Sequence, residues 1–359
     1  VLFSVTGSDE LNDRKTLVRF SLSVIICAVL TVYSFVNVLN KPLNLDITAQ
    51  QDSDSADVTV TSINTAEKKE TDNTQSSKTQ ATAESKSDAV PTAAREAAIG
   101  TVSEKFISPY TAKTSYKNIY VKNSSGLNVD IKSLYEAKLG YKIDKKSEPQ
   151  VLIMHTHTTE SFLEESRDFY TASDKSRTTD EAKNMVALGN IVTQKLNEAG
   201  INTLHDKTTH DYPSYNESYK RASKTILSYL KKYPSIKIVI DMHRDAITPS
   251  ANEKVKLTTE IGGKKAAQIM LVMGSQSGSV TNFPNWQENL KLALKLQEKL
   301  ESKYPTLARS LSLMSRNYNE SLSTGSMLIE IGTDANSLEE VSYSATLLGN
   351  ALSELLLKL

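Results

Sequence analysis

The sequence is poor in several residue types, and each scarcity excludes something. Its single cysteine, Cys27, rules out an intramolecular disulfide. Lys plus Arg and Asp plus Glu each number 42, and this balance gives no electrostatic reason to expect nucleic-acid binding. Histidine is also scarce, with five residues, so the positions of those five carry weight. The 359 residues are enough for two average domains, or for one large domain with extra segments.

The chain has one long stretch without charge, from Phe20 to Asn40. About 20 mostly apolar residues are what a helix needs to cross a bilayer. The stretch is longer than the apolar part of a cleaved signal peptide, and no A-x-A cleavage pattern follows it. Basic residues gather within 1–19, whereas only Lys41 follows the stretch directly. By the positive-inside rule we expect a cytoplasmic segment at 1–19, a membrane anchor at 20–40 and an extracytoplasmic remainder. The alternative is a buried core helix.

Residues 41–105 are expected to form a flexible tether. Between Asp46 and Lys105 the chain is rich in Ser, Thr, Asp, Ala, Lys, Gln and Glu and contains no aromatic residue. Such a stretch buries too little apolar surface to offset chain entropy. A flexible coil of roughly 60 residues spans about 40–50 Å root-mean-square. An anchor and a tether would hold a domain away from the membrane, where a polymer such as a cell wall could lie.

The remainder reads as folded. Aromatic residues return at 106–149, which we interpret as a lead-in segment or a small subdomain. Residues 150–359 alternate strand-like and helix-like patterns, which predicts an α/β fold with a mainly parallel twisted sheet and helices on both faces. The expected strands are 150–154, 201–204, 236–241, 269–274, 311–314 and 327–331, and the expected helices are 181–199, 216–232, 286–303 and 337–357.

Polar side chains of metal-binding type lie at the ends of these strands. His155 and His157 follow the first strand, His243 follows the third, and Glu330 lies within the last. In open α/β sheets, ligands bind beyond the carboxyl ends of the strands. One histidine in a turn is more often a surface residue, but two at the ends of such strands favour a shared site. A catalytic zinc needs three protein ligands and an open position. The placement therefore favours a metallohydrolase.

Two carboxylates are candidates for that site. Glu181 opens the first expected helix, where it could point back toward the strand ends or simply be favoured by the helix dipole. Glu330 sits in an apolar strand, where burial would raise its pKa and suit a general base. The alternative for Glu330 is a buried ion pair with Arg244 or Arg316.

The remaining histidines leave choices open. His155 and His157 share a face if the backbone alternates as a strand, so either could be the ligand. The other could orient a ligand or contact substrate, and Glu160 has the same two possibilities. We expect His205 and His210 on the surface.

In their order along the chain, these residues resemble the zinc-dependent N-acetylmuramoyl-L-alanine amidases of the type 3 family. In that family a strand leads to a zinc histidine, and a glutamate about one helix length before a glycine is the second ligand. A histidine after a central strand and a glutamate in a Leu-x-Glu-x-Gly-like strand complete the set. The resemblance implies His157, Glu181 and His243 as ligands of Zn²⁺ and Glu330 as the catalytic acid and base.

Three motifs resemble the stage II sporulation protein P family more closely, and the match covers roughly 106–359. Membership implies a membrane-anchored peptidoglycan hydrolase that acts in engulfment of the forespore. Such an enzyme cuts the amide between muramic acid and the stem peptide, and also acts as an endopeptidase on peptide cross-links. A His-Thr-His in place of the amidases' Gly-His-Gly keeps the choice between the first two histidines open. The motifs are His155-Thr-His-Thr-Thr-Glu-Ser161, Asp241-Met-His-Arg-Asp-Ala246 and Leu328-Ile-Glu-Ile-Gly332.

The same resemblance implies partners and a location. The partners are peptidoglycan, the lytic transglycosylase stage II sporulation protein D and the polytopic membrane protein stage II sporulation protein M, at the septal or forespore-facing membrane. Arg244 could stabilise an oxyanion or bind a peptide carboxylate. Two other readings are an exported metallo-carboxypeptidase and an inactive wall-binding or septal scaffold protein with a hydrolase-like fold.

Overall fold

The computed structural model describes Arg95, residues 97–144 and residues 148–359, which all belong to one compact unit that spans 53–359. The expected cytoplasmic segment, the expected membrane span and most of the expected tether lie outside the described residues. Within the described ranges, no helix has the length and apolar character that a membrane crossing requires. The anchor therefore stays a prediction.

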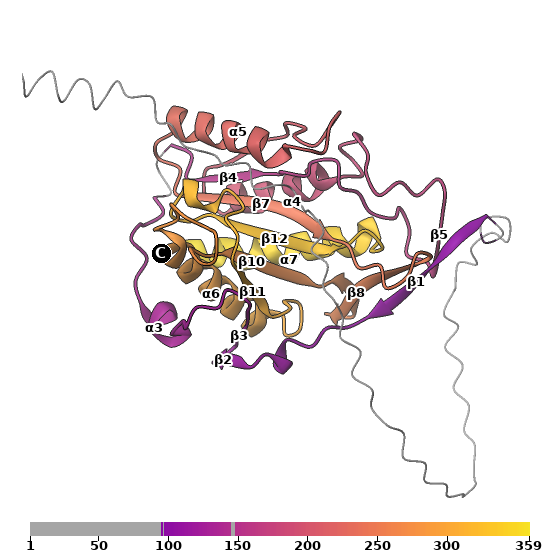
Figure 1. The fold of residues 1–359 in the computed structure, drawn as a ribbon, viewed down its shortest axis with the longest axis horizontal. Helices are drawn as coiled ribbons and strands as arrows, with labels where there is room; N and C mark the ends of the chain where they lie inside the picture. The colour runs from indigo at the N-terminus through magenta and orange to yellow at the C-terminus, as the bar shows by residue number, and fades with distance from the viewer. Residues whose placement is uncertain (1–94, 96, 145–147) are drawn as a thin grey trace, which may run out of the picture. The chain divides into compact units, whose positions relative to one another are not determined.

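An eight-stranded sheet organises this unit (Figure 1). Its strands are β2 (Thr114–Tyr116), β3 (Ile119–Asn123), β4 (Val151–Met154), β6 (Thr203–His205), β7 (Ile238–Asp245), β10 (Ile269–Gly274), β11 (Leu311–Met314) and β12 (Met327–Thr333). The order is β2-β3-β11-β10-β12-β7-β4-β6. Five of the seven neighbouring pairs are parallel, and only β2–β3 and β10–β12 are antiparallel. The predicted α/β fold with a mainly parallel sheet is confirmed.

Different helices cover the two faces of the sheet, because residues along each strand alternate between faces. On β4, Val151 and Ile153 pack into a core that also holds buried residues of four helices, α3, α4, α6 and α7. Leu152 and Met154 point the other way and pack against Ala222 of α5. The helices are α3 (Ile131–Glu136), α4 (Met185–Glu198), α5 (Ser218–Lys232), α6 (Trp286–Lys303) and α7 (Leu338–Leu356).

A second sheet of four strands corrects the predicted tether. Its strands are β1 (Ala98–Lys105), β5 (Phe169–Thr171), β8 (Glu253–Ile261) and β9 (Lys264–Ala267), in the order β5-β1-β8-β9. β1 lies within the residues expected to be flexible. It pairs antiparallel with β5 and parallel with β8, and only Val102 of this strand is buried. Backbone pairing with distant strands, and not apolar content, orders this segment.

The lead-in segment 106–149 also joins the folded unit. β2 and β3 form one edge of the eight-stranded sheet, with β3 parallel to β11. Ile119, Val121 and Ile131 are buried in the same core as α6. These residues therefore extend the central sheet.

The first long helix begins later than its sequence pattern predicts. α4 starts at Met185, where the Asn184 side chain caps it by accepting a hydrogen bond from the Val186 amide at 2.9 Å. Residues 181–183 form turns, and the side chain of Asp180 accepts a hydrogen bond from the Ala182 amide within these turns. The expected helix start at 181 is wrong, and this matters for the carboxylate at that position.

Candidate active site

Strand β7 carries two buried polar residues on one face, Asp241 and His243, two positions apart. His243 Nε2 lies 2.9 Å from Asp241 Oδ1, although the angle does not make a hydrogen bond. Asp241 also accepts hydrogen bonds from Thr156, from its amide at 2.7 Å and its hydroxyl at 2.6 Å. These contacts join β7 to the turn that follows β4.

His157 lies in that turn, with its ring edge-on to His243. The ring centroids are 5.2 Å apart and the planes make an angle of 88°. One face of His157 stacks on Tyr215 at 4.6 Å, and Tyr219 approaches edge-on at 5.6 Å. Tyr215 Oη lies 3.3 Å from His157 Nε2. Of the two histidines that the sequence left open, His157 is the one beside His243.

Glu160 brings a carboxylate to this pair. Its Oε2 lies 3.9 Å from His243 Nδ1 and accepts a hydrogen bond from the Arg244 amide at 3.1 Å. Its Oε1 lies 3.4 Å from Arg177 Nη2. Glu160 is only 6% exposed. A buried carboxylate and two histidines therefore share one small region.

The structure does not bring Glu181 to the histidines. This residue lies in the turn before α4, and its side chain is 58% exposed. Its Oε2 pairs with Lys207 Nζ at 3.6 Å. The sequence expectation relied on a helix that starts at 181, and the actual start at Met185 removes that geometry. Of the two glutamates, Glu160 and not Glu181 lies next to His243.

His155 is engaged within the fold on both ring nitrogens. Its Nδ1 lies 3.0 Å from the Met242 carbonyl, which can only accept, so Nδ1 carries the proton. Its Nε2 lies 2.8 Å from His205 Nε2. Burial is the main cause that lowers the pKa of His155, to about 4. These contacts fix the end of β4 against β7.

The expectation that His205 and His210 lie on the surface is wrong for His210, whereas His205 is half-buried. His210 is 1% exposed, with Nδ1 2.8 Å from the His155 carbonyl and Nε2 2.9 Å from Thr225 Oγ1. His205 is partly buried against His155, and burial lowers its pKa to about 3. All five histidines of the chain thus gather around the end of β4.

Glu330 lies on β12 opposite His243 of β7. Its Oε2 is buried and has no hydrogen-bond partner among the described residues. Burial raises the pKa of Glu330 to about 8; the charge of Asp245 adds to this, and those of His243 and Arg309 oppose it. In the described part of the chain Glu330 forms no ion pair, so the alternative pairing with an arginine is not found.

Arg244 has another task. Its Nε donates to the Ser161 carbonyl at 2.9 Å and its Nη2 to the Ser176 carbonyl at 2.7 Å. The residue is 7% exposed. These bonds commit the guanidinium to the loops that surround Glu160, while Arg316 is exposed.

The carboxylates around His243 favour a positive charge at that residue, whereas the surroundings of His157 oppose one. Although burial opposes it, the charges of Asp241, Glu160 and Glu330 raise the pKa of His243 to about 10. Burial, together with the charge of His243, lowers the pKa of His157 to about 2. Two imidazoles and a carboxylate are ligand types that zinc prefers. As the side chains stand, no three His, Cys, Asp or Glu residues of the described ranges are arranged to hold a metal ion.

Sequence reasoning missed several neighbours of the site. Asp241 was detectable, because it stands two residues before His243 and so shares its face of the strand. The stack of Tyr215 on His157 left no such signal, because Tyr215 lies outside any regular element, before α5. The Arg177 guanidinium lies over the Tyr215 ring, 4.6 Å from its centroid. Arg177 is held in turn by Asp211, with Nη1 and Oδ2 2.5 Å apart.

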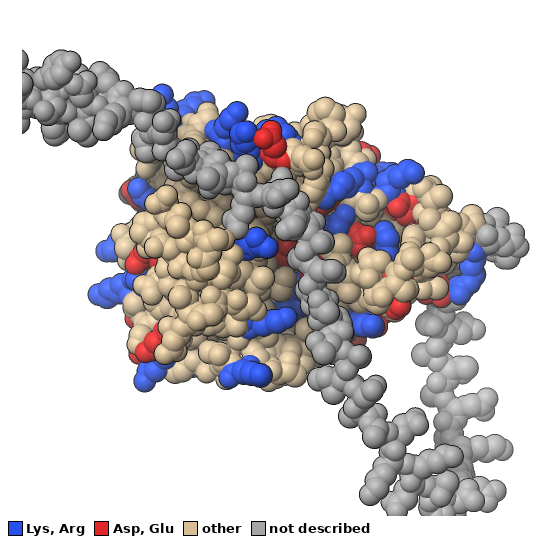
Figure 2. All heavy atoms as spheres, viewed as in Figure 1, with Lys and Arg blue, Asp and Glu red and all other residues tan. Residues whose placement is uncertain are grey.

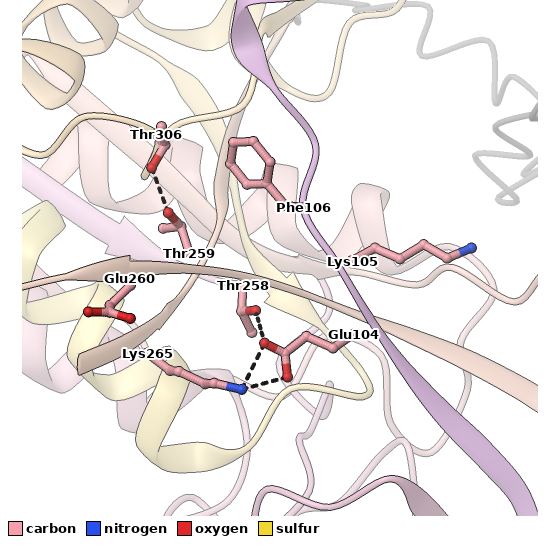
Figure 3. Close-up of a pocket in the computed structure, with 8 residues that line it drawn as sticks. All are labelled: Glu104, Lys105, Phe106, Thr258, Thr259, Glu260, Lys265 and Thr306. Atoms are coloured by element: carbon pink, nitrogen blue, oxygen red, sulfur yellow. Dashed lines mark hydrogen bonds and ion pairs between the residues drawn. The ribbon is translucent and has the colours of Figure 1, made fainter. Parts of the chain in front are cut away.

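A separate hollow of about 460 Å³ opens beside the end of β1 (Figure 3). None of the expected site residues lines it. Glu104, on its wall, accepts hydrogen bonds from Lys265 Nζ and from Thr258 Oγ1 (Figure 3). The lining residues are Glu104, Lys105, Phe106, Thr258, Thr259, Glu260, Lys265 and Thr306.

Solved structures with some similarity are amidases, at low identity. The N-acetylmuramoyl-L-alanine amidase AmiC2 of Nostoc punctiforme is 10% identical, over 59% of this chain and 97% of that chain, with a TM-score of 0.35. An N-acetylmuramoyl-L-alanine amidase from Clostridium difficile 630 is 14% identical, over 59% and 97%, with a TM-score of 0.34. The CwlD amidase from Clostridioides difficile, in complex with the GerS lipoprotein, is 12% identical, over 58% and 97%, also at 0.34. Scores this low carry no argument, so the fold rests on the strand order above.

Sequence comparison is more informative. Stage II sporulation protein P of Bacillus subtilis (strain 168) is 28% identical over 218 residues, which are 57% of this chain and 50% of that protein. The match thus spans about half the length of this relative. The family model for stage II sporulation protein P matches residues 15–353, nearly the whole sequence. The resemblance seen in the three motifs is confirmed, and this chain belongs to the stage II sporulation protein P family.

Proposed function

We propose that this chain is a zinc-dependent peptidoglycan hydrolase that cleaves the N-acetylmuramoyl-L-alanine amide, and also peptide cross-links, during sporulation. The observation that carries the proposal is one cluster: His157, His243 and Glu160 lie together, and Glu330 faces His243 from the neighbouring strand. Family membership supports the same function.

In this proposal His157, His243 and Glu160 hold the zinc ion. Glu160 replaces Glu181, the ligand that the type 3 amidase resemblance implied, because only Glu160 lies beside His243. When bound, zinc would polarise the carbonyl of the substrate amide and lower the pKa of a water molecule to about 7. Asp241 orients the His243 ring from the side opposite Glu160, since it approaches Nε2 while Glu160 approaches Nδ1.

Glu330 is the proposed general acid and base. Its buried Oε2 can take up a proton and return it to the leaving amine, and a pKa raised to about 8 suits both transfers near neutral pH. Arg244 acts as a support for the Glu160 loops, since its donors bind the carbonyls of Ser161 and Ser176.

The location and partners are also proposals. The uncharged run at 20–40 and the basic residues before it support a single-pass protein with a cytoplasmic N-terminus and an extracytoplasmic catalytic domain at the septal or forespore-facing membrane. Stage II sporulation proteins D and M are proposed partners through the family.

The test is digestion of purified peptidoglycan by the full chain, with products identified by mass spectrometry. We expect a freed lactyl group and an intact stem peptide, which a carboxypeptidase or an inactive scaffold would not produce. EDTA should abolish release and zinc should restore it. Glu330→Gln should lower the rate about 10²- to 10⁴-fold with zinc content unchanged. Glu165→Gln, an exposed carboxylate elsewhere, is the control. Full activity of Glu330→Gln, or cleavage that ignores EDTA, would refute the proposal.

A further inference from the structure

The outer face of α5 carries a line of basic side chains that the proposed chemistry does not use. Within Ser218–Lys232 there are five Lys and Arg residues and no acidic one, whereas the whole chain has 42 of each sign. Lys220, Lys224 and Lys231 are all exposed. Separations of four and seven residues return to the same helix face, so the three form one stripe. The stripe is a local feature, since the chain as a whole is neutral.

The opposite face of α5 is already occupied. Ala222 and Ile226 are buried against Met154 of β4 and Val239 of β7. On the solvent side Leu227, 38% exposed, is the only large exposed hydrophobic residue of the helix. A helix that binds a lipid surface needs a broad apolar face to bury among the headgroups, and α5 has none left. The chemistry of the stripe therefore fits an anionic polymer better than a membrane.

The charges of the stripe are largely uncompensated. Lys220 pairs with Glu217 at 3.0 Å, but both side chains are exposed and such a pair contributes little. Lys224 and Lys231 form no ion pair with a carboxylate in the described part of the chain. Figure 2 shows Lys and Arg side chains gathering over α5, at the top of the view.

The helix that carries the stripe starts beside the candidate active site. Tyr219, in the first turn of α5, contacts His157 edge-on, and Lys220 is the next residue. From Lys220 to Lys231 the stripe is about 16 Å long, at about 1.5 Å per residue. A polymer held with one bond at His157 can thus extend along the basic face.

We propose that Lys220, Lys224 and Lys231 bind the stem-peptide carboxylates of peptidoglycan on one side of the bond that is cut. The inference rests on the proposed function and names the part of the substrate that α5 recognises. Each exposed lysine contributes weakly, but several contacts along one strand act together and raise the local concentration of substrate.

The test uses the full chain and insoluble peptidoglycan freed of attached phosphate polymers. In a sedimentation assay at low salt, the triple variant Lys220→Gln, Lys224→Gln, Lys231→Gln should bind about tenfold more weakly than wild type. Added salt should remove most of that difference. In turnover, the loss should appear in KM with little change in kcat. A Lys→Arg triple at the same positions should retain binding, and Lys113→Gln, Lys122→Gln, Lys132→Gln is the matched control at exposed lysines elsewhere.

Two further probes identify the ligand. In the first probe, the carboxylates of peptidoglycan are chemically amidated. We expect wild type to bind this amidated polymer weakly, with the same affinity that the Gln triple has for untreated peptidoglycan. The inference is overturned if the Gln triple binds untreated peptidoglycan like wild type, or if amidation of the polymer does not weaken binding by wild type. It is also overturned if the Gln triple binds peptidoglycan normally and loses binding only to vesicles of anionic phospholipid. Sedimentation measures binding without turnover, so it tests the role of α5 separately from the proposed hydrolase activity. A wild type that binds through α5 but releases no product refutes the hydrolase, whereas a Gln triple that binds normally refutes only the role of α5.

Discussion

His243 Nε2 lies 2.9 Å from Oδ1 of Asp241, the residue two positions earlier on β7. The strand itself sets this contact, because alternate residues share a face. Thr156 holds the same carboxylate through its amide and its hydroxyl. Asp241 therefore ties a proposed zinc ligand to the turn that carries the other histidine.

Replacing Asp241 with asparagine should lower zinc affinity about 10- to 100-fold while the protein still folds, because the amide keeps the shape but removes the charge beside His243. Competition with a chromophoric chelator measures this. Asp168→Asn, whose side chain is 62% exposed, is the control. Equal zinc affinity in Asp241→Asn and wild type would show that this carboxylate does not support the site.

The choice between two glutamates is open to direct measurement. Glu160→Gln should lose most bound zinc, since it removes the carboxylate 3.9 Å from His243 Nδ1. Glu181→Gln should keep it, because that side chain is exposed and faces Lys207. Zinc content of the two purified variants by atomic absorption decides. Loss of zinc in Glu181→Gln alone would restore the ligand set that the amidase resemblance implies.

Gly189→Ala should destabilise the protein even though the substitution normally favours a helix by about 1 kcal/mol. A Cβ at this position of α4 would overlap His205 Nε2 and lie 2.7 Å from His155 Nε2. Overpacking of this kind costs about 1–3 kcal/mol, measured as the free energy of unfolding in urea.

Gly140→Ala is the control for that substitution. Its added Cβ would meet only Glu288 Oε2, at an ordinary contact distance of 3.6 Å. Equal losses at Gly189 and Gly140 would mean that the histidine pair is not the rigid obstacle.

Glu104 should make stability depend on acid pH. Burial opposes it, but hydrogen bonds from Lys265 and Thr258 lower the pKa of Glu104 to about 2, below its ordinary 4.5. As pH falls, the Glu104 carboxyl takes up its proton at a higher pH in the unfolded chain than in the folded protein. This stabilisation is therefore complete above about pH 5 and is lost as pH falls toward 2. The group is partly exposed, so Glu104→Gln should lower the melting temperature at pH 7 by only about 2 °C, with a smaller difference at pH 3. A pH-independent difference in thermal unfolding would contradict this.

Local patterns were enough for the central elements. The bounds of α6, β10 and β11 match their sequence patterns to the residue, because each is an apolar or amphipathic run with clear ends. The four-stranded sheet could not be predicted. β1 and β8 are separated by about 150 residues, and Lys256, in the middle of β8, is buried through an ion pair with Glu340 at 2.9 Å. From the sequence alone a lysine is predicted to be exposed, because the distant carboxylate that allows its burial cannot be identified.

Some residues of the candidate site could likewise be predicted from local sequence patterns, and others could not. His157, His243 and Glu330 could be located because strand ends in a parallel sheet converge. Glu181 was misplaced because either Asp180 or Asn184 could cap the helix, and only the structure shows Asn184 as the cap. The burial of His205 and His210 depends on partners far along the chain, which periodicity does not encode.

The pairing of β1 has a mechanical consequence. β1 is the first described strand, and it lies between β5 and β8, held by backbone hydrogen bonds on both edges. A pull on the chain from before Ala98 would act along the strand axis, so those bonds would be loaded together in shear and not opened one after another. If the residues before β1 connect the domain to a membrane, tension during remodelling of the wall would reach the four-stranded sheet first.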